Sequence, residues 1–509
     1  MTALAAAPAA WPAAVPAEVR ADAPADLSVT LYRAPYRSPG SLDLDRLGGF
    51  ALVSEIRTVR LPAGESRLRF EGVADGIEPA SAIVTGLDGV VLEKNRDAAL
   101  LSPRALIDAA AGKPVQLLRA DAKTGEPERL PGRILSDADG GVVFETAQGI
   151  EALRCSGLSE SFSFAGIGAL SAHPVLSVLV QSPHPVSRQV TLSYLARGFD
   201  WTADYTATLS ADGKSMDLGA WVTLANGNGV GFPAAHTQVV AGRVNREGAD
   251  VRPLDAGGPI LARCWPRGST SDTPVLLQLT GALSRSETAR AAIMPMAMLA
   301  APAADAQHVA QEQLGDLKLY RVPEPTTVAS RQSKQVRLMD RHEIPVEVIY
   351  VAELDSGAAS VAVAAGRRLR TRNTAAHHLG LALPSGSVAV FASHDGMRLL
   401  ERESAIQDLA VGEELELDAG ASPDVRLSAT SETADADRRA NRVEIRNARP
   451  GAIRFELRLR LPDGARLIHA DHAAVTENGR PLFRLDVPAA ATVTLRYEVE
   501  PAPALKNPR

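Results

Sequence analysis

The sequence predicts a mostly β protein, built from several antiparallel β-sandwich units of the immunoglobulin-like type, with a small SH3-like barrel insert and few helices. The first observation is the period of the apolar residues. Val190, Leu192 and Tyr194 alternate with polar residues, so they share one face of a strand. The second is the spacing of turn residues such as Ala211-Asp-Gly213. Turns at intervals of roughly 8–12 residues are typical of sandwiches and barrels.

Residues 187–246 carry the most regular alternation in the chain and two of its four tryptophans. The expected strands and hairpin cover 190–194, 205–216, 221–224 and 237–241. We expect Trp201 and Trp221 to be core aromatics rather than a ligand platform. Glycines 227, 229 and 231 follow the third segment. A phosphate-binding loop needs its glycines between a strand and a helix N-terminus. Another strand follows here, so we interpret them as a turn.

Composition excludes several functional classes. The chain has 509 residues, with 54 basic and 60 acidic side chains and a net charge of −6, so it has no electrostatic footprint for nucleic acid. Aromatic residues make up only 4%, which leaves few stacking platforms for bases. No run reaches about 18 uninterrupted apolar residues, so no transmembrane segment is predicted. The motifs HExxH, GxSxG and the Walker loop are not found, and no cofactor or metal site is predicted.

At this length we expect about three or four domains. The predicted division is a disordered Ala/Pro-rich tail at 1–26, an N-terminal β domain at 27–182 with the small barrel inserted at about 115–158, a central β domain at 183–283, an Ala/Met/Pro linker or loop at 284–314, a β domain continuing the central unit at 315–428, and a C-terminal immunoglobulin-like sandwich at 429–509. Ser102 followed by Pro103 is a helix start signal, which predicts a short helix through Ala111.

The insert at 115–158 contains short strands joined by tight turns at Lys123-Thr-Gly125 and Asp139-Gly-Gly141. Small barrels of this kind bind peptides or nucleic acid in other proteins. On this composition we favour a structural insert, and a peptide- or polymer-binding module is the alternative. The binding module predicts an open groove on the barrel.

The sulfur-containing residues leave two alternatives open. Cys155 and Cys264 can form a disulfide in an oxidising compartment, and we favour two separate buried thiols. In the linker, Met294, Met296 and Met298 lie among alanines and prolines. We interpret this stretch as a mobile linker or protruding loop. An adaptable binding surface or a copper ligand set is the alternative.

The best enzyme constellation in the sequence is Asp200, Asp204 and His236, with Arg243 nearby. Two carboxylates and a histidine can serve as acid, base and orienting group in hydrolysis. Capping and turn roles explain the two aspartates equally well. A hydrolase predicts carboxylates within about 5–10 Å of each other around a concave site. A binding protein predicts the three dispersed among turns on different faces.

A basic run precedes two adjacent histidines. The residues are Arg367, Arg368, Arg370, Arg372, His377 and His378. The run could bind an acidic polymer such as an exopolysaccharide. We favour a solvated strand edge, where basic side chains discourage aggregation. Adjacent histidines on a strand point to opposite faces and cannot chelate one ion together, so we expect them in a surface loop.

Several segments together resemble a known family. They are LSYLARGFDWTADYTATL, DLGAWVTLANGNG, QVVAGRVNR, GDLKLYRVPEPTTVASRQSKQV and VEIRNARPGAIRFELRLRLPDGAR. In this order they resemble a bacterial domain of unknown function found in mucoidy-inhibitor-like proteins, over about residues 183–500. The resemblance implies a β-rich architecture and an envelope location, and it brings no catalytic residues. The family commonly has a coiled-coil insertion in its N-terminal half, and here the small barrel replaces it.

We therefore expect a non-catalytic, multidomain β protein that acts in binding or assembly at the cell surface, with a protein or polysaccharide partner. The alternative is a hydrolase at Asp200, Asp204 and His236. We expect a periplasmic or envelope location, with the cytoplasm as the alternative. Residues 1–19 are rich in Ala and Pro, with no Lys or Arg before Arg20. This stretch is compatible with a trimmed signal peptide and with a disordered tail.

Overall fold

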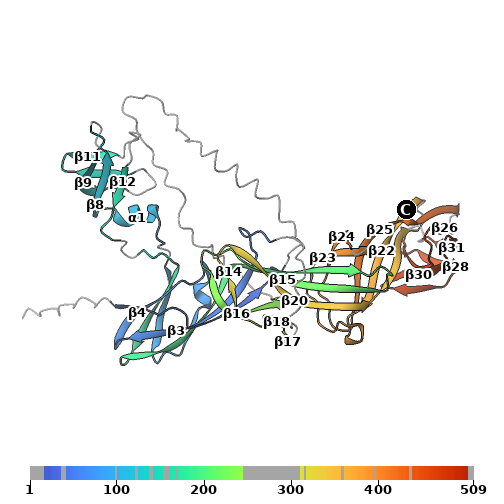
Figure 1. Cartoon of the computed structure of the whole chain (residues 1–509), viewed down its shortest axis with the longest axis horizontal. Helices are drawn as coiled ribbons and strands as arrows, with labels where there is room; N and C mark the ends of the chain where they lie inside the picture. Colours follow the sequence, from blue (N-terminus) through green and yellow to red (C-terminus); the bar gives the residue numbers. More distant parts are fainter. Residues whose placement is uncertain are drawn as a thin grey trace, which may run out of the picture.

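The computed structural model confirms a mostly β protein with several sheets. It describes residues 16–35, 40, 42–97, 100–120, 124–136, 142–152, 160–166, 170–242, 244, 310–314, 317–356, 360–394, 397–434 and 438–501. Figure 1 shows a chain of β units, with the C-terminal strands at one end and the small barrel projecting to one side. Within the described residues, no helix has the length and apolar character needed to cross a membrane.

The N-terminal unit is a sandwich. One layer is a four-stranded sheet in the order β1 (Ala17–Arg20), β4 (Gly64–Glu71), β13 (Val175–Ser182) and β7 (Val90–Asp97). Leu68, Phe70 and Val178 on its inner face join one core with Val53 and Leu192 of the larger sheet. The prediction of disorder for 1–26 is therefore wrong at β1, which pairs in parallel with β4.

The second layer belongs to a larger sheet, which continues through the middle of the molecule. Its main path is β17 (Ala310–Leu314), β18 (Leu317–Arg321), β16 (Phe232–Ala241), β2 (Asp26–Tyr32), β3 (Gly49–Leu61), β14 (Val186–Leu209), β15 (Ser215–Asn226) and β20 (Gln332–Pro345). Off this path lie β5 (Gly76–Ile77), β6 (Ile83–Thr85), β19 (Thr326–Val328), β23 (Gly386–His394) and β24 (Met397–Ile406), with a short 3₁₀ turn at Pro79–Ser81. β2 and β3 pair directly with β16 and β14, so this sheet crosses the boundary that we predicted at residue 183.

β14 is the strand around which this sheet is organised. Its first part pairs with β3, and beyond Phe199 it pairs with β15 and in parallel with β23. The exchange of partners coincides with a bulge at Gly198, whose φ of 80° favours glycine. Val190, Leu192 and Tyr194 are buried, as the alternation predicts.

The small barrel has its own sheet and core. Its five strands run in the order β11 (Gly149–Ala152), β10 (Val143–Thr146), β9 (Pro127–Ile134), β8 (Pro114–Ala120) and β12 (Glu160–Ser163). The predicted helix is present as α1 (Pro103–Ala110), where the Ser102 hydroxyl accepts a hydrogen bond from the Ala105 N–H at 3.0 Å. Val115, Leu117 and Phe144 form a core separate from the other two.

The C-terminal unit is a nine-stranded sheet. Its order is β28 (Arg466–Ala470), β31 (Thr492–Glu500), β26 (Arg439–Asn447), β25 (Glu414–Ala434), β22 (Ser360–Arg372), β21 (Glu347–Asp355), β27 (Ile453–Arg460), β30 (Arg480–Val487) and β29 (Ala474–Glu477). It includes β21 and β22, which we had assigned to the central unit. The reason is the length of β25: Leu415 and Leu417 lie in the central core, whereas Val425 and Leu427 lie in the C-terminal core.

Candidate binding pocket

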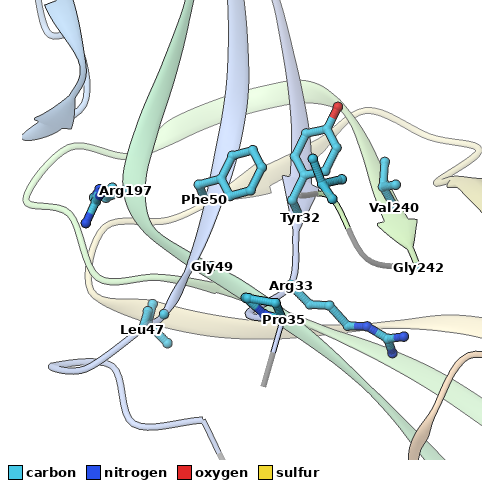
Figure 2. A pocket seen from close by; sticks show the side chains of 11 residues that line it. Tyr32, Arg33, Pro35, Leu47, Gly49, Phe50, Arg197, Val240 and Gly242 are labelled. Atoms are coloured by element: carbon cyan, nitrogen blue, oxygen red, sulfur yellow. The ribbon is translucent and has the colours of Figure 1, made fainter. Parts of the chain in front are cut away.

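A cavity of about 220 Å³ opens where three strands of the large sheet begin or end. Figure 2 shows the residues around it, which come from the end of β2, the start of β3, the bulge of β14 and the end of β16. The lining residues are Tyr32, Arg33, Pro35, Leu47, Gly48, Gly49, Phe50, Arg197, Val240, Gly242 and Val244. Most of them are apolar or glycine, as is typical of ligand pockets.

Strand register brings four of these residues into one row. Val240 lies opposite Tyr32, Tyr32 opposite Phe50, and Phe50 opposite Arg197. Directly opposed residues on neighbouring strands project to the same face. This face is the outer one, because Leu31 and Ala51, the neighbours of Tyr32 and Phe50 in sequence, are buried in the core. Figure 2 shows the row in this order.

Tyr32 and Phe50 stack against each other. Their ring centroids are 4.6 Å apart and the ring planes differ by 5°. Both side chains are half-buried. Tyr194, Tyr205, Tyr320, Tyr350 and Tyr497 are buried in the cores, so Tyr32 is the one tyrosine among the described residues that reaches the surface. Partial burial raises the pKa of its hydroxyl, and the hydroxyl is therefore neutral at physiological pH.

Asp200 holds one wall of the pocket. Its carboxylate is buried and its Oδ1 accepts hydrogen bonds from the N–H groups of Ala34, at 3.2 Å, and Trp201, at 2.8 Å. The first bond holds the segment that carries Arg33 and Pro35. Gly49 packs directly against this segment. A Cβ at position 49 would lie 2.4 Å from the Tyr32 carbonyl oxygen, so only glycine fits.

Trp201 holds a second wall. Its indole is fully buried, as predicted, and Nε1 donates to the Val240 carbonyl at 3.2 Å. The Arg33 guanidinium lies 5.5 Å from the centroid of the indole, within the range of a cation–π contact. Arg33 also donates to the Ser385 hydroxyl at 2.7 Å and forms an ion pair with Asp408.

Arg197 closes the row on the other side. Its Nε donates to Oε1 of Glu78, which is buried, at 3.2 Å. Glu78 lies in the segment between β5 and the 3₁₀ turn, so this pair fastens the turn to β14. The two arginines at the pocket therefore each have a carboxylate partner.

The three residues of the predicted hydrolase site have different partners. Asp204 is half-buried and accepts a hydrogen bond from the Thr223 hydroxyl at 2.6 Å. His236 is exposed on β16 and lies 3.5 Å from Asp26. Asp200 and Asp204 are four residues apart on one strand, which separates them by about 13 Å at the usual rise per residue. The structure does not gather these three groups around one cleft, and Arg243 lies outside the described residues.

The glycine-rich stretch after β15 is a structural junction. Asn228 donates to the carbonyls of Arg197 and Gly198, at 3.1 and 3.2 Å, and accepts from the Gly76 N–H at 2.9 Å. Asn226 accepts from the Asn228 N–H at 2.9 Å. Both side chains are buried. This arrangement agrees with our interpretation of the stretch as a turn, and it fastens the β14 bulge below the pocket.

The basic run lies on an interior strand, so the prediction of a strand edge is wrong. β22 pairs with both β21 and β25. Arg368 forms an ion pair with Asp418 at 2.6 Å. Arg370 donates to Glu416 and, through both terminal nitrogens, to the buried Glu456 at 2.8 and 2.9 Å. These arginines are neutralised within the sheet.

Trp221 is not a core residue, because it lies on the outer face of β15. Arg337 of the neighbouring strand covers it, with 5.0 Å between the guanidinium and the ring centroid. The two adjacent histidines lie in the turn after β22, where we expected a loop. His377 Nδ1 accepts from the Arg372 N–H at 3.2 Å, and His378 Nδ1 lies 3.1 Å from the His342 carbonyl.

The sulfur-containing candidates, Cys155, Cys264, Met294, Met296 and Met298, lie outside the described residues. Sequence reasoning missed Tyr32 and Phe50, because each sits at an ordinary alternating position in its strand. It also missed the buried pair Glu55 and Arg57, which are 2.6 Å apart. The signal for that pair was two opposite charges on the apolar face of a long alternating strand.

No known protein-family model matches the chain. A comparison with curated proteins finds no match either. The resemblance to the mucoidy-inhibitor-like family therefore remains a prediction from the segments quoted above.

Proposed function

We propose that this protein is a non-catalytic β-sandwich protein of the bacterial cell envelope that acts in binding or assembly at the cell surface. The observation that carries the proposal is the chemistry of the pocket. Its lining is apolar and aromatic, and the charged groups beside it are held by partners within the protein. General acid–base catalysis needs an ionisable group within hydrogen-bond reach of the reacting atom. The carboxylate of Asp200, beside the pocket residue Gly49, is buried and engaged by two backbone N–H groups.

The architecture also supports a binding role. Long strands such as β22 and β25 pass through two cores, so the central and C-terminal units share strands. Sites carried on regular strands are held more precisely than sites on loops. The family resemblance described above supports the envelope location.

Cell fractionation followed by crosslinking in intact cells tests the proposed function. We expect the chain in the periplasmic or envelope fraction, crosslinked reproducibly to the same envelope protein or polysaccharide. A cytosolic protein of the same abundance serves as the fractionation control. Recovery of the chain wholly in the cytosolic fraction, with no envelope component attached, would contradict the proposal.

A further inference from the structure

We propose that the pocket between β2, β3, β14 and β16 binds one uncharged, electron-rich aromatic ring. This inference rests on the proposed binding function and names the class of ligand.

The size and lining of the cavity select a small apolar group. Its volume of about 220 Å³ is below the range of about 300–1,000 Å³ that holds drug-sized ligands, so it suits a single ring system. Leu47, Val240 and Pro35 contribute apolar walls beside the two stacked rings. Burial of an apolar ring against these walls provides the driving force.

The stacked pair favours an aromatic ligand over an aliphatic one. Tyr32 and Phe50 each use one ring face for the other, because their planes are nearly parallel. Val240 and Arg197 flank the pair in the row, and the ring edges carry the positive part of the quadrupole. A third ring laid against these edges forms edge-to-face contacts, and electron-rich rings such as phenol and indole form them best. An aliphatic ring of the same size has no negative face to offer.

The charges around the cavity favour an uncharged ligand. Arg33 is paired with Asp408, and Arg197 with Glu78. Asp200 already accepts two backbone hydrogen bonds. A charged ligand would lose its hydration on entry and would have to compete with these internal partners. A neutral ring avoids that cost.

The same chemistry can come from two sources, a tryptophan or tyrosine side chain of a polypeptide or a free aromatic molecule. N-acetyl-tryptophanamide and indole distinguish them. Binding of both assigns the pocket to a polypeptide side chain. Binding of indole alone assigns it to a free aromatic compound. Each result supports an aromatic-ring site.

Calorimetric titration of the full-length protein tests the site with phenol and cyclohexanol, which are uncharged and similar in size. We expect saturable binding of phenol at one site and about three- to tenfold weaker binding of cyclohexanol, the range that an edge-to-face contact gives. Tyr32→Leu puts an apolar side chain in place of one of the two rings, so it is expected to lower the preference for phenol. The matched control is Phe391→Leu, a half-buried phenylalanine on β23 outside the pocket.

Leu47→Trp provides a second variant, because the larger side chain fills the cavity from its wall. We expect at least tenfold weaker binding of phenol. Leu135→Trp, at an exposed leucine between β9 and β10 of the small barrel, is the control and should bind like the parent protein. Circular dichroism checks that all four variants are folded.

Three results would overturn the site. They are no saturable binding of phenol or indole by the parent protein, equal affinity for phenol and cyclohexanol, and unchanged phenol binding by Leu47→Trp. The proposed function has a separate test. A chain that crosslinks in the envelope but fails to bind phenol keeps the function and loses this site. A cytosolic chain that binds phenol keeps the site and loses the envelope role.

Discussion

Asp200 lies beside Gly49 of the pocket, and one carboxylate oxygen, Oδ1, accepts hydrogen bonds from two backbone N–H groups. A buried N–H that loses its acceptor costs about 1–3 kcal/mol, because it cannot return to water. The role of Asp200 is therefore to hold the segment around Ala34 against β14. Asp204, four residues later, makes one hydrogen bond to Thr223 and is half-buried.

We therefore expect Asp200→Ala to lower the free energy of unfolding by about 1–3 kcal/mol and Asp204→Ala by about 0.5–1 kcal/mol. Urea denaturation of both variants measures the difference. Asp200→Asn is the control, because an amide oxygen can still accept both hydrogen bonds, and it should lie between the parent protein and Asp200→Ala. Equal destabilisation by the two alanine variants would contradict this role for Asp200.

Two buried asparagines, Asn226 and Asn447, close turns in the same way. Asn226 and Asn447 each accept from the N–H two residues on, at 2.9 and 3.0 Å, and each donate to the carbonyl four residues on, at 2.9 Å. Both side chains are buried at the end of a strand. An asparagine side chain in this position closes a turn and satisfies backbone groups that the strand ladder leaves open.

At the scale of the element, side chains of opposite charge on different strands form ion pairs across the outer face of the C-terminal sheet. Arg370 of β22 bridges Glu416 of β25 and Glu456 of β27. Arg454 of β27 reaches Glu347 of β21 at 2.5 Å. Glu456 is buried although it lies on the outer side of its strand, because the arginines cover it. Their hydrogen bonds hold the pKa of its carboxyl below the ordinary value.

This lowered pKa predicts a loss of stability in acid. The carboxyl has an ordinary pKa of about 4.5, so below that pH the unfolded chain binds a proton that the folded chain does not. The contribution of Glu456 is present above pH about 4.5 and falls as the pH drops through the folded pKa. Glu456→Gln lacks this proton site. Its destabilisation relative to the parent protein should therefore shrink between about pH 5 and pH 3.

Chemical denaturation at these two pH values measures the effect. The control is Glu353→Gln, which removes an exposed partner of Arg460. Exposed ion pairs contribute little, so we expect this variant to stay within about 0.5 kcal/mol of the parent protein at either pH. A destabilisation by Glu456→Gln that stays constant or grows as the pH falls would rule out this account.

At the scale of the whole molecule, the described residues form three cores. The central and C-terminal cores share β22 and β25, since both strands contribute residues to each. The core of the small barrel shares no residue with either. Contiguous units with their own core open as separate cooperative units, so we expect the barrel to unfold independently of the rest.

Phe144→Ala tests this independence. Phe144 is buried in the barrel core, and truncation of a buried phenylalanine costs about 3–5 kcal/mol. Hydrogen exchange followed by mass spectrometry should show faster exchange in peptides from β8 to β10 and unchanged exchange in β14. Phe455→Ala, in the C-terminal core, is the matched control and should leave the barrel peptides unchanged. Faster exchange in β14 of Phe144→Ala would show that the cores are coupled.

The sequence by itself determined the strands, the turns and the one described helix, because their signals are local. A period of two places alternate side chains on one face whatever the strand later pairs with, which is why Val190, Leu192 and Tyr194 are buried as predicted. The helix at Pro103–Ala110 follows from its cap and its first residue. Trp221 shows the limit of this reasoning, since hydrophobicity alone predicted burial and register placed the ring outside.

The tertiary structure alone decided the domain boundaries, the partners of the charged residues and the position of the pocket. Tyr32 and Phe50 come from consecutive strands, whereas Arg197 and Val240 come from strands more than a hundred positions later, and all four meet because strand register aligns them. Asp200 and the arginines of β22 have structural roles because groups on neighbouring segments hydrogen-bond or pair with them. Pairing across long loops depends on the free energy of the whole sheet, and no local pattern encodes which strand will be the neighbour.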